Sequence, residues 1–180
     1  MRTGRLWVYR LLTALMPESR FYGFKVAVLR WAGIKIGSGV RIYSSTSFQG
    51  SGNIEIGDDV FIGPRCILTA SAGATLHIGN NVNIGAMCYI ATGTHLVDPD
   101  GDRTCGEGFG RDVIIEDGAW LTVHILVLPG VMEERMVIGK KAMVIGGGVI
   151  TASVPERAVM QGVPATQIAT LKFRRQRKKV

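Results

Sequence analysis

The sequence predicts an all-β fold, a solenoid of stacked coils preceded by a short helical segment. Two observations carry this prediction. Aliphatic residues recur every six positions between residues 34 and 153, and 24 glycines but only 7% aromatic residues occur among the 180 residues. Self-similarity at a fixed period is typical of solenoids, and glycine readily forms the tight corners between short strands. Periods of 3.6 or 7 do not fit, which excludes helices and coiled coils for this region.

The hexads fall into sets of three, and glycine often follows the aliphatic marker, as at positions 37, 57, 63, 79, 85 and 139. A hexad suits a short strand with an inward-pointing marker, followed by a tight corner. Three hexads then close one triangular coil, and stacked coils bury a continuous aliphatic column. The markers are Ile36, Ile42 and Phe48; Ile56, Ile62 and Leu68; Ile78, Ile84 and Ile90; Ile115, Leu121 and Val127; and Ile138, Val144 and Ile150.

The net charge of +7 is concentrated at the two ends of the chain. Residues 1–41 hold eight Lys or Arg and one acid, residues 42–171 hold seven bases and thirteen acids, and residues 172–180 hold six bases. This pattern favours anionic small molecules or an anionic membrane surface as partners. A nucleic-acid partner is not predicted, because the basic tail has one aromatic residue, Phe173, and no recognition motif.

The three cysteines, Cys66, Cys88 and Cys105, are odd in number and lack CxxC spacing. They therefore indicate neither a disulfide framework nor a cysteine zinc site, and a reducing cytoplasm fits them best. Cys66 and Cys88 lie among aliphatic residues, so we expect both to be packing groups.

The first 33 residues predict two amphipathic helices, the second at about residues 20–32. Arg10 and Pro17 interrupt the apolar stretch, so neither a signal peptide nor a membrane span is predicted. Two interpretations remain open. The helices cap the open end of the solenoid, or they cap it and also contact a membrane interface, because basic residues alternate with Trp7, Leu15 and Trp31.

The repeat stops after His95, and a loop is predicted at residues 96–114. A loop of this length inside a compact domain tends to be functional, and this one could cover a site at a neighbouring subunit. A neutral imidazole accepts a proton readily near physiological pH, so His95 at the loop base is a candidate general base.

The stretches "IEIGDDVFIGPRCIL", "LHIGNNVNIGAMCYI", "AWLTVHILVLPGV" and "VITASVPERAVMQGVPA" resemble the hexapeptide-repeat acyltransferases, over roughly residues 34–170. The resemblance is greatest to the group that O-acetylates sugars and polysaccharides. It implies a left-handed parallel β-helix, a homotrimer, and acetyl-CoA as the acyl donor bound in a groove between subunits.

The resemblance also implies roles for individual residues. "ATGTH" matches the family's motif and makes His95 the catalytic base, while Trp120 and, by spacing, Arg65 are candidates for binding the acceptor. Two departures concern the donor site: bulky Val123 replaces a small residue, and Thr166 replaces an expected basic residue. The positions that match the family's cofactor contacts are Val123, Gly146, Thr151 and Thr166.

The histidines test a rival interpretation, because some proteins of the same fold are zinc carbonic anhydrases with three histidine ligands. His77, His95 and His124 are the three histidines, and no two are close in sequence. No metal site is therefore predicted.

The sequence thus predicts a helical cap (1–33), a β-helix (34–153) with the inserted loop, and a C-terminal extension with a basic tail (154–180). The predicted function is acetyl-CoA-dependent O-acetylation of a sugar or lipid-linked glycan, for surface polysaccharide or glycolipid synthesis. The predicted location is the cytoplasm, free or at the inner face of the membrane. Two alternatives remain open: an N-acyltransferase acting on an amino sugar, and a non-catalytic trimeric scaffold that binds membrane or polyanion.

Overall fold

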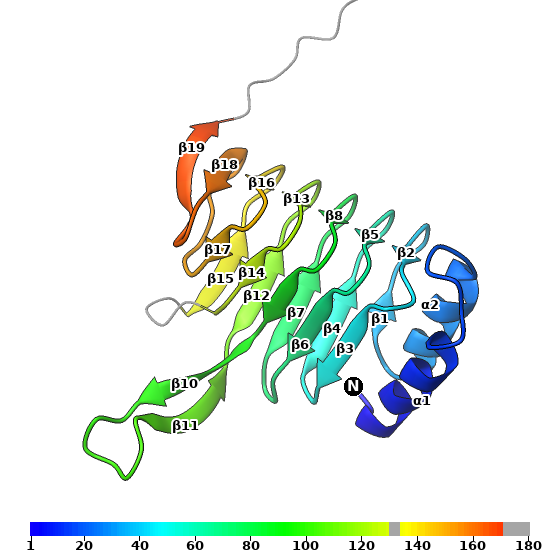
Figure 1. Ribbon diagram of the computed structural model, residues 1–180, viewed down its shortest axis with the longest axis horizontal. Helices are drawn as coiled ribbons and strands as arrows, with labels where there is room; N and C mark the ends of the chain where they lie inside the picture. The colour runs from blue at the N-terminus through cyan, green and yellow to red at the C-terminus, as the bar shows by residue number, and fades with distance from the viewer. Residues whose placement is uncertain (130–133, 171–180) are drawn as a thin grey trace, which may run out of the picture.

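The computed structural model describes residues 1–129 and 134–170, and the hexads form a parallel β-helix (Figure 1). Each coil contributes one strand to each of three parallel sheets. The first sheet contains β1 (Lys35–Ile36), β4 (Asn53–Ile56), β7 (Thr75–Ile78), β12 (Asp112–Ile115) and β15 (Arg135–Ile138). The second contains β2 (Arg41–Ile42), β5 (Phe61–Ile62), β8 (Asn83–Ile84), β13 (Trp120–Leu121) and β16 (Met143–Val144), and the third contains β3 (Ser47–Gly50), β6 (Ile67–Ala70), β9 (Tyr89–Ala91), β14 (Leu126–Val127) and β17 (Val149–Ile150).

The aliphatic column predicted from the hexads is present. Every marker is buried, and most have no exposed surface. Each fully buried aliphatic side chain stabilises the fold by about 1.5–3 kcal/mol relative to exposure, so the column is the main source of stability. Cys66 and Cys88 are buried as well, which confirms that they are packing groups.

Corners between the first and second sheets explain why glycine follows the marker. A Cβ at Gly57 would lie 2.8 Å from the backbone of Gly79 in the next coil, so no side chain fits there. Side chains of adjacent coils satisfy the exposed backbone N–H groups of these corners. Asp58 accepts hydrogen bonds from the backbone N–H and hydroxyl of Ser38, and these bonds hold the pKa of its carboxyl below the usual value.

The N-terminal helices α1 (Thr3–Thr13) and α2 (Tyr22–Trp31) cover one end of the column, as predicted (Figure 1). Leu6 and Tyr9 of α1 and Leu29 of α2 are buried, and the Tyr9 ring packs edge-on against Phe48 of the first coil at 5.8 Å between centroids. Within the described ranges, no helix has the length and hydropathy needed to cross a bilayer.

A buried lysine connects the helices to the first coil. Lys25 of α2 donates hydrogen bonds to the carbonyl oxygen of Glu18, at 3.0 Å, and to the hydroxyl of Ser44, at 3.3 Å. Its side chain has no exposed surface, and burial lowers the pKa of the ammonium group. The connection between α1 and α2 is therefore fixed against the solenoid.

The other end of the solenoid is closed by a strand pair. β18 (Ala158–Gln161) continues the second sheet beside β16 and pairs antiparallel with β19 (Thr166–Thr170). These strands belong to the predicted C-terminal extension. The basic tail at 172–180 lies outside the described residues.

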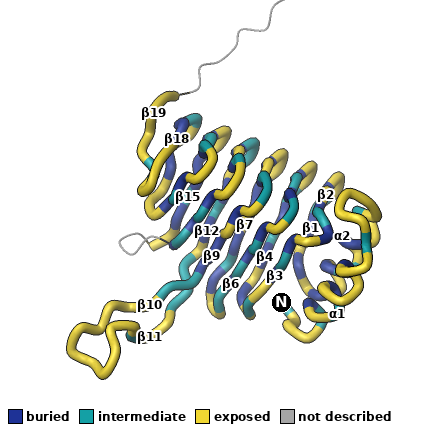
Figure 2. The backbone as a smooth tube through the Cα atoms, viewed as in Figure 1, coloured by how far each residue is buried: buried dark blue, intermediate teal, exposed yellow. Residues whose placement is uncertain are grey.

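The interruption after His95 is not an irregular loop but an antiparallel hairpin. β10 (Gly93–Val97) and β11 (Cys105–Gly110) project from the solenoid between β9 and β12, and most of the hairpin is exposed (Figures 1 and 2). Few of its side chains are apolar, so no alternating pattern typical of a strand is visible in residues 93–110. The hairpin carries His95 away from the aliphatic column.

Candidate functional site

The base of the hairpin is fixed by buried contacts with the preceding coil. Thr92 is fully buried, and its hydroxyl accepts a hydrogen bond from the backbone N–H of Ser71 at 2.8 Å. The N–H of Thr92 in turn donates to the carbonyl oxygen of Thr69 at 3.1 Å. A Cβ at Gly93 would overlap the Ser71 hydroxyl, so a larger residue there would require the Ser71 side chain to turn away.

A hydrogen bond across the hairpin sets the tautomer of the neutral His95 ring. Its Nδ1 lies 3.0 Å from the carbonyl oxygen of Gly106 on β11. A carbonyl oxygen can only accept, so in the neutral ring Nδ1 carries the proton and Nε2 keeps its lone pair. The ring is exposed, and therefore Nε2 is able to accept a proton from a bound molecule.

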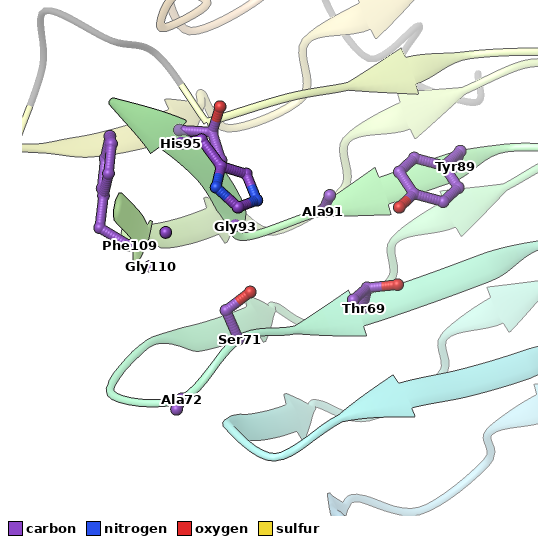
Figure 3. A pocket seen from close by; sticks show the side chains of 11 residues that line it. Thr69, Ser71, Ala72, Tyr89, Ala91, Gly93, His95, Phe109 and Gly110 are labelled. Carbon is purple, nitrogen blue, oxygen red and sulfur yellow. The ribbon is translucent and has the colours of Figure 1, made fainter. Parts of the chain in front are cut away.

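A hollow of about 340 Å³ lies beside the His95 ring, between the hairpin and the third sheet (Figure 3). The hydroxyl-bearing residues that line it are Thr69, Ser71, Tyr89 and Thr94, and Phe109 lines it from β11. The Thr69 hydroxyl oxygen is buried and has no hydrogen-bond partner within the described chain. Apart from His95, none of the described residues that line the hollow is ionisable near neutral pH, so the site suits an uncharged polar molecule.

Gly108 positions the imidazole, and we predict an effect of adding a methyl group there. Gly108 pairs with His95 across the hairpin, and a Cβ would lie 3.2 Å from His95 Cε1, so the ring must move. We expect Gly108→Ala to lower kcat by about tenfold, since small misplacements of a catalytic group are costly. Steady-state kinetics should show the loss in kcat rather than KM, with an unchanged melting temperature. A normal kcat would contradict this role.

The other predicted site residues lie elsewhere on the chain. Arg65 is exposed at the corner between β5 and β6, with φ of 57°, and Trp120 is exposed on β13 of the second sheet. Val123 and Gly146 occupy successive corners between the second and third sheets, where a Cβ on Gly146 would lie 3.1 Å from Val123 Cγ1. These four residues thus lie along the second sheet and its corner with the third.

Thr151 and Thr166 lie closer to the C-terminal end. Thr151 directly follows β17 in the last coil, and Thr166 begins β19. Both are exposed. Neither lines the hollow beside His95.

One chain does not bring His95 together with Arg65 and Val123. From Arg65 to Ser71 the chain runs across the third sheet, and six extended residues span about 20 Å. The hollow lies at the Ser71 end, whereas Arg65 and Val123 lie at the opposite edge.

The histidines lie on three separate surfaces. His77 is on the outward side of β7, with Nδ1 at 3.4 Å from a carboxylate oxygen of Glu55, and His124 is at a corner with Nε2 at 3.0 Å from Met87 Sδ. Within residues 1–129 and 134–170, no three His, Cys, Asp or Glu side chains are grouped so that they could hold a metal ion.

Sequence reasoning missed the aromatic and hydroxyl groups of the hollow. Tyr89 stands in the third sheet beside the marker Ile90, and its neighbours across the ladder, Ile67 and Leu126, also point outward. Phe109 lines the hollow from β11, where it pairs with Thr94 across the hairpin. The alternation within hexads could have indicated that Tyr89 points outward, but nothing in the sequence indicated the hairpin register.

The arrangement can be compared with known proteins. No known family profile matches the chain. The chain is 32% identical over 115 residues to a galactoside O-acetyltransferase of Lactococcus lactis, covering 64% of this chain and 52% of that protein. A solved hexapeptide-repeat acetyltransferase of Vibrio cholerae superimposes with a TM-score of 0.74 at 22% identity, covering 94% of this chain and 90% of the other. Both comparisons therefore support the predicted resemblance to the hexapeptide-repeat acyltransferases.

A further relative matches more of its own length. A putative colanic acid biosynthesis acetyltransferase of Escherichia coli is 27% identical over 170 residues, covering 91% of this chain and 85% of that protein. By contrast, the chain spans about half the length of the galactoside O-acetyltransferase. The predicted fold class, an all-β parallel β-helix with an N-terminal helical cap, is confirmed.

Proposed function

We propose that the protein is an acetyl-CoA-dependent O-acetyltransferase that modifies a sugar hydroxyl, with His95 as the general base. The observation that carries this proposal is the hydrogen bond from His95 Nδ1 to the Gly106 carbonyl oxygen, which leaves Nε2 free beside an uncharged, hydroxyl-lined hollow. The names of the relatives support the reaction class, since they include a galactoside O-acetyltransferase.

The chemistry needs a single base. A sugar hydroxyl is a poor nucleophile until its proton is removed, and His95 Nε2 accepts this proton as the oxygen attacks the thioester carbonyl carbon. The C–O bond forms, the tetrahedral intermediate collapses with loss of the C–S bond, and the imidazolium returns the proton to the leaving thiolate. The Gly106 carbonyl dipole stabilises the imidazolium in between, because it faces the Nδ1–H group.

The proposed site is completed by a neighbouring copy in a homotrimer. His95 and the hollow would come from one subunit, and Arg65, Trp120, Val123, Gly146, Thr151 and Thr166 would contact acceptor and acetyl-CoA from the groove between subunits. The outward row Ile67, Tyr89, Leu126 and Val149 on the third sheet supports such an interface, because these largely apolar side chains are only half-buried or exposed in one chain.

The proposed acceptor is a sugar or a lipid-linked glycan used for surface polysaccharide or glycolipid synthesis. The aromatic ring of Tyr89 supports a sugar, since it offers an apolar face beside the hydroxyls of Thr69 and Ser71. The relative named for colanic acid biosynthesis supports a polysaccharide role. We place the enzyme in the cytoplasm, consistent with three free cysteines.

An acceptor panel tests this function. The purified protein is incubated with acetyl-CoA and separate sugars, amino sugars, nucleotide sugars and lipid-linked glycans, and products are read by mass. We expect a mass increase of one acetyl group on a hydroxyl acceptor, with an ester that mild base removes. An amide product resistant to mild base would instead indicate an N-acyltransferase, and no thiol release with any acceptor would favour a non-catalytic scaffold.

A further inference from the structure

The N-terminal helices expose apolar side chains on the side opposite the core. In α1 the buried residues Leu6, Tyr9 and Thr13 form one face. Residues advance about 100° per position along a helix, so Trp7 and Leu11 point away from that face. Their side chains are 65% and 57% exposed, and Leu15, in the turn that follows the helix, is 90% exposed.

The second helix repeats this arrangement. In α2 the buried residues are Lys25, Val26 and Leu29, and helical spacing places Phe24 and Trp31 on the opposite face. Both are exposed, at 47% and 50%. We call Trp7, Leu11, Leu15, Phe24 and Trp31 the outer helix face.

The two helices are joined at this face by a basic residue. The Arg5 guanidinium lies 4.4 Å from the centroid of the Trp31 ring, and it also donates a hydrogen bond to the Trp31 carbonyl oxygen at 2.6 Å. Trp31 of α2 therefore lies beside the first turns of α1. In Figures 1 and 2 the helix pair forms one end of the solenoid, with exposed segments on its outer side.

The charge around the outer helix face is almost entirely positive. Residues 1–33 contain six Lys or Arg and one acid, Glu18, so their net charge is +5. The Glu18 carboxylate accepts hydrogen bonds from the backbone N–H and hydroxyl of Ser45, at 3.1 and 3.0 Å, on the side of the first coil. Arg10 is exposed, between Trp7 and Leu11 in sequence.

We propose that the outer helix face is a peripheral membrane-binding surface for an anionic bilayer. Interfacial helices of this kind combine tryptophan and leucine side chains, which enter the headgroup region, with basic residues that attract anionic lipid. A second copy of the chain is a poor occupant, because two surfaces of charge +5 repel each other. The apolar side chains supply binding energy, and the arginines select the anionic surface.

Membrane binding would hold the candidate site at a defined distance from the bilayer surface. The use of this distance for catalysis rests on the proposed function. The hairpin with His95 leaves the solenoid after the third coil from the capped end. With the solenoid axis perpendicular to the membrane, three coil spacings of about 4.8 Å and one helix diameter of about 10 Å separate the hairpin from the bilayer surface. This distance is roughly 25 Å. This height suits a glycan attached to a membrane lipid.

Vesicle flotation with the full-length protein tests the proposal without requiring any acyl transfer. The vesicles contain phosphatidylcholine alone or phosphatidylcholine mixed with phosphatidylglycerol. We expect the protein to float with the anionic vesicles only. Leu11→Ser together with Leu15→Ser should weaken this binding by about tenfold or more, because two exposed leucines lose their burial in lipid.

A matched pair of substitutions controls for general loss of surface hydrophobicity. Val97 and Ile168 are also exposed, at 73% and 53%, but lie on the hairpin and on β19. Val97→Ser with Ile168→Ser should bind anionic vesicles as the wild type does. Circular dichroism should show that both double variants are folded, since all four side chains are exposed.

Three outcomes would overturn the proposal. The first is no flotation of the wild-type protein with anionic vesicles. The second is equal flotation of both double variants and the wild type, which would mean that basic residues outside the outer helix face bind the vesicles. The third is a smaller particle for Leu11→Ser with Leu15→Ser in vesicle-free solution, with unchanged flotation. That result would mean that the outer helix face meets a second protein chain instead of lipid.

Discussion

Replacing His95 with alanine is expected to reduce turnover by about 10²–10⁴-fold, the usual contribution of a general base. The imidazole donates through Nδ1 to the Gly106 carbonyl oxygen, and its Nε2 is the free basic atom beside the hollow. Without it, the acceptor hydroxyl must lose its proton to water. The measurement is thiol release from acetyl-CoA at saturating acceptor, together with the mass of the product.

His77→Ala is the matched control for this experiment. His77 is half-exposed on the outward side of β7, and its Nδ1 lies 3.4 Å from the Glu55 carboxylate. An exposed pair of this kind contributes little to stability, so activity and melting temperature should both stay near wild type. Unchanged turnover in His95→Ala, with the fold intact, would refute the proposed base.

Much of the fold could be predicted because a hexad repeat has few physical solutions. Markers such as Ile62, Ile84 and Leu121 are buried in one column because parallel pairing aligns equivalent positions of successive coils. The helices could be predicted for a similar reason: Leu6, Tyr9 and Leu29 must cover the open end of that column. In both cases, a local pattern determines a single buried face.

The candidate site was less predictable because its parts depend on contacts between distant segments. The sequence indicated His95 through its motif. Its hydrogen bond to the Gly106 carbonyl oxygen, however, follows from a hairpin register that no apolar pattern specifies. The predicted roles of Arg65 and Trp120 remain predictions. Both residues lie away from the hollow within one chain, and an interface between chains leaves no periodic signal in the sequence.

Replacing Gly85 with alanine adds one methyl group and is expected to destabilise the fold, in contrast to Gly108→Ala, for which no change in melting temperature is expected. Gly85 follows the marker Ile84, and its N–H donates to the carbonyl oxygen of Leu121 at 2.8 Å. A Cβ at this position would overlap the carbonyl oxygen of Thr122 in the next coil. Both groups are backbone, so the coils themselves must separate, which breaks ladder hydrogen bonds and opens the aliphatic column.

We expect Gly85→Ala to cost about 3 kcal/mol or more, above the common range for added methylenes, because no flexible side chain can yield. For a chain of this size, thermal unfolding should then shift downward by about 6–12 °C. Gly23→Ala is the matched control, because Gly23 lies in α2 with no atom within 4 Å of the added Cβ. Alanine favours helix over glycine by about 0.5–1 kcal/mol, so this control should raise the melting temperature slightly. Equal melting temperatures for the two variants would mean that the next coil leaves room for a methyl group at Gly85. That result would contradict the close approach of the two coils at this corner.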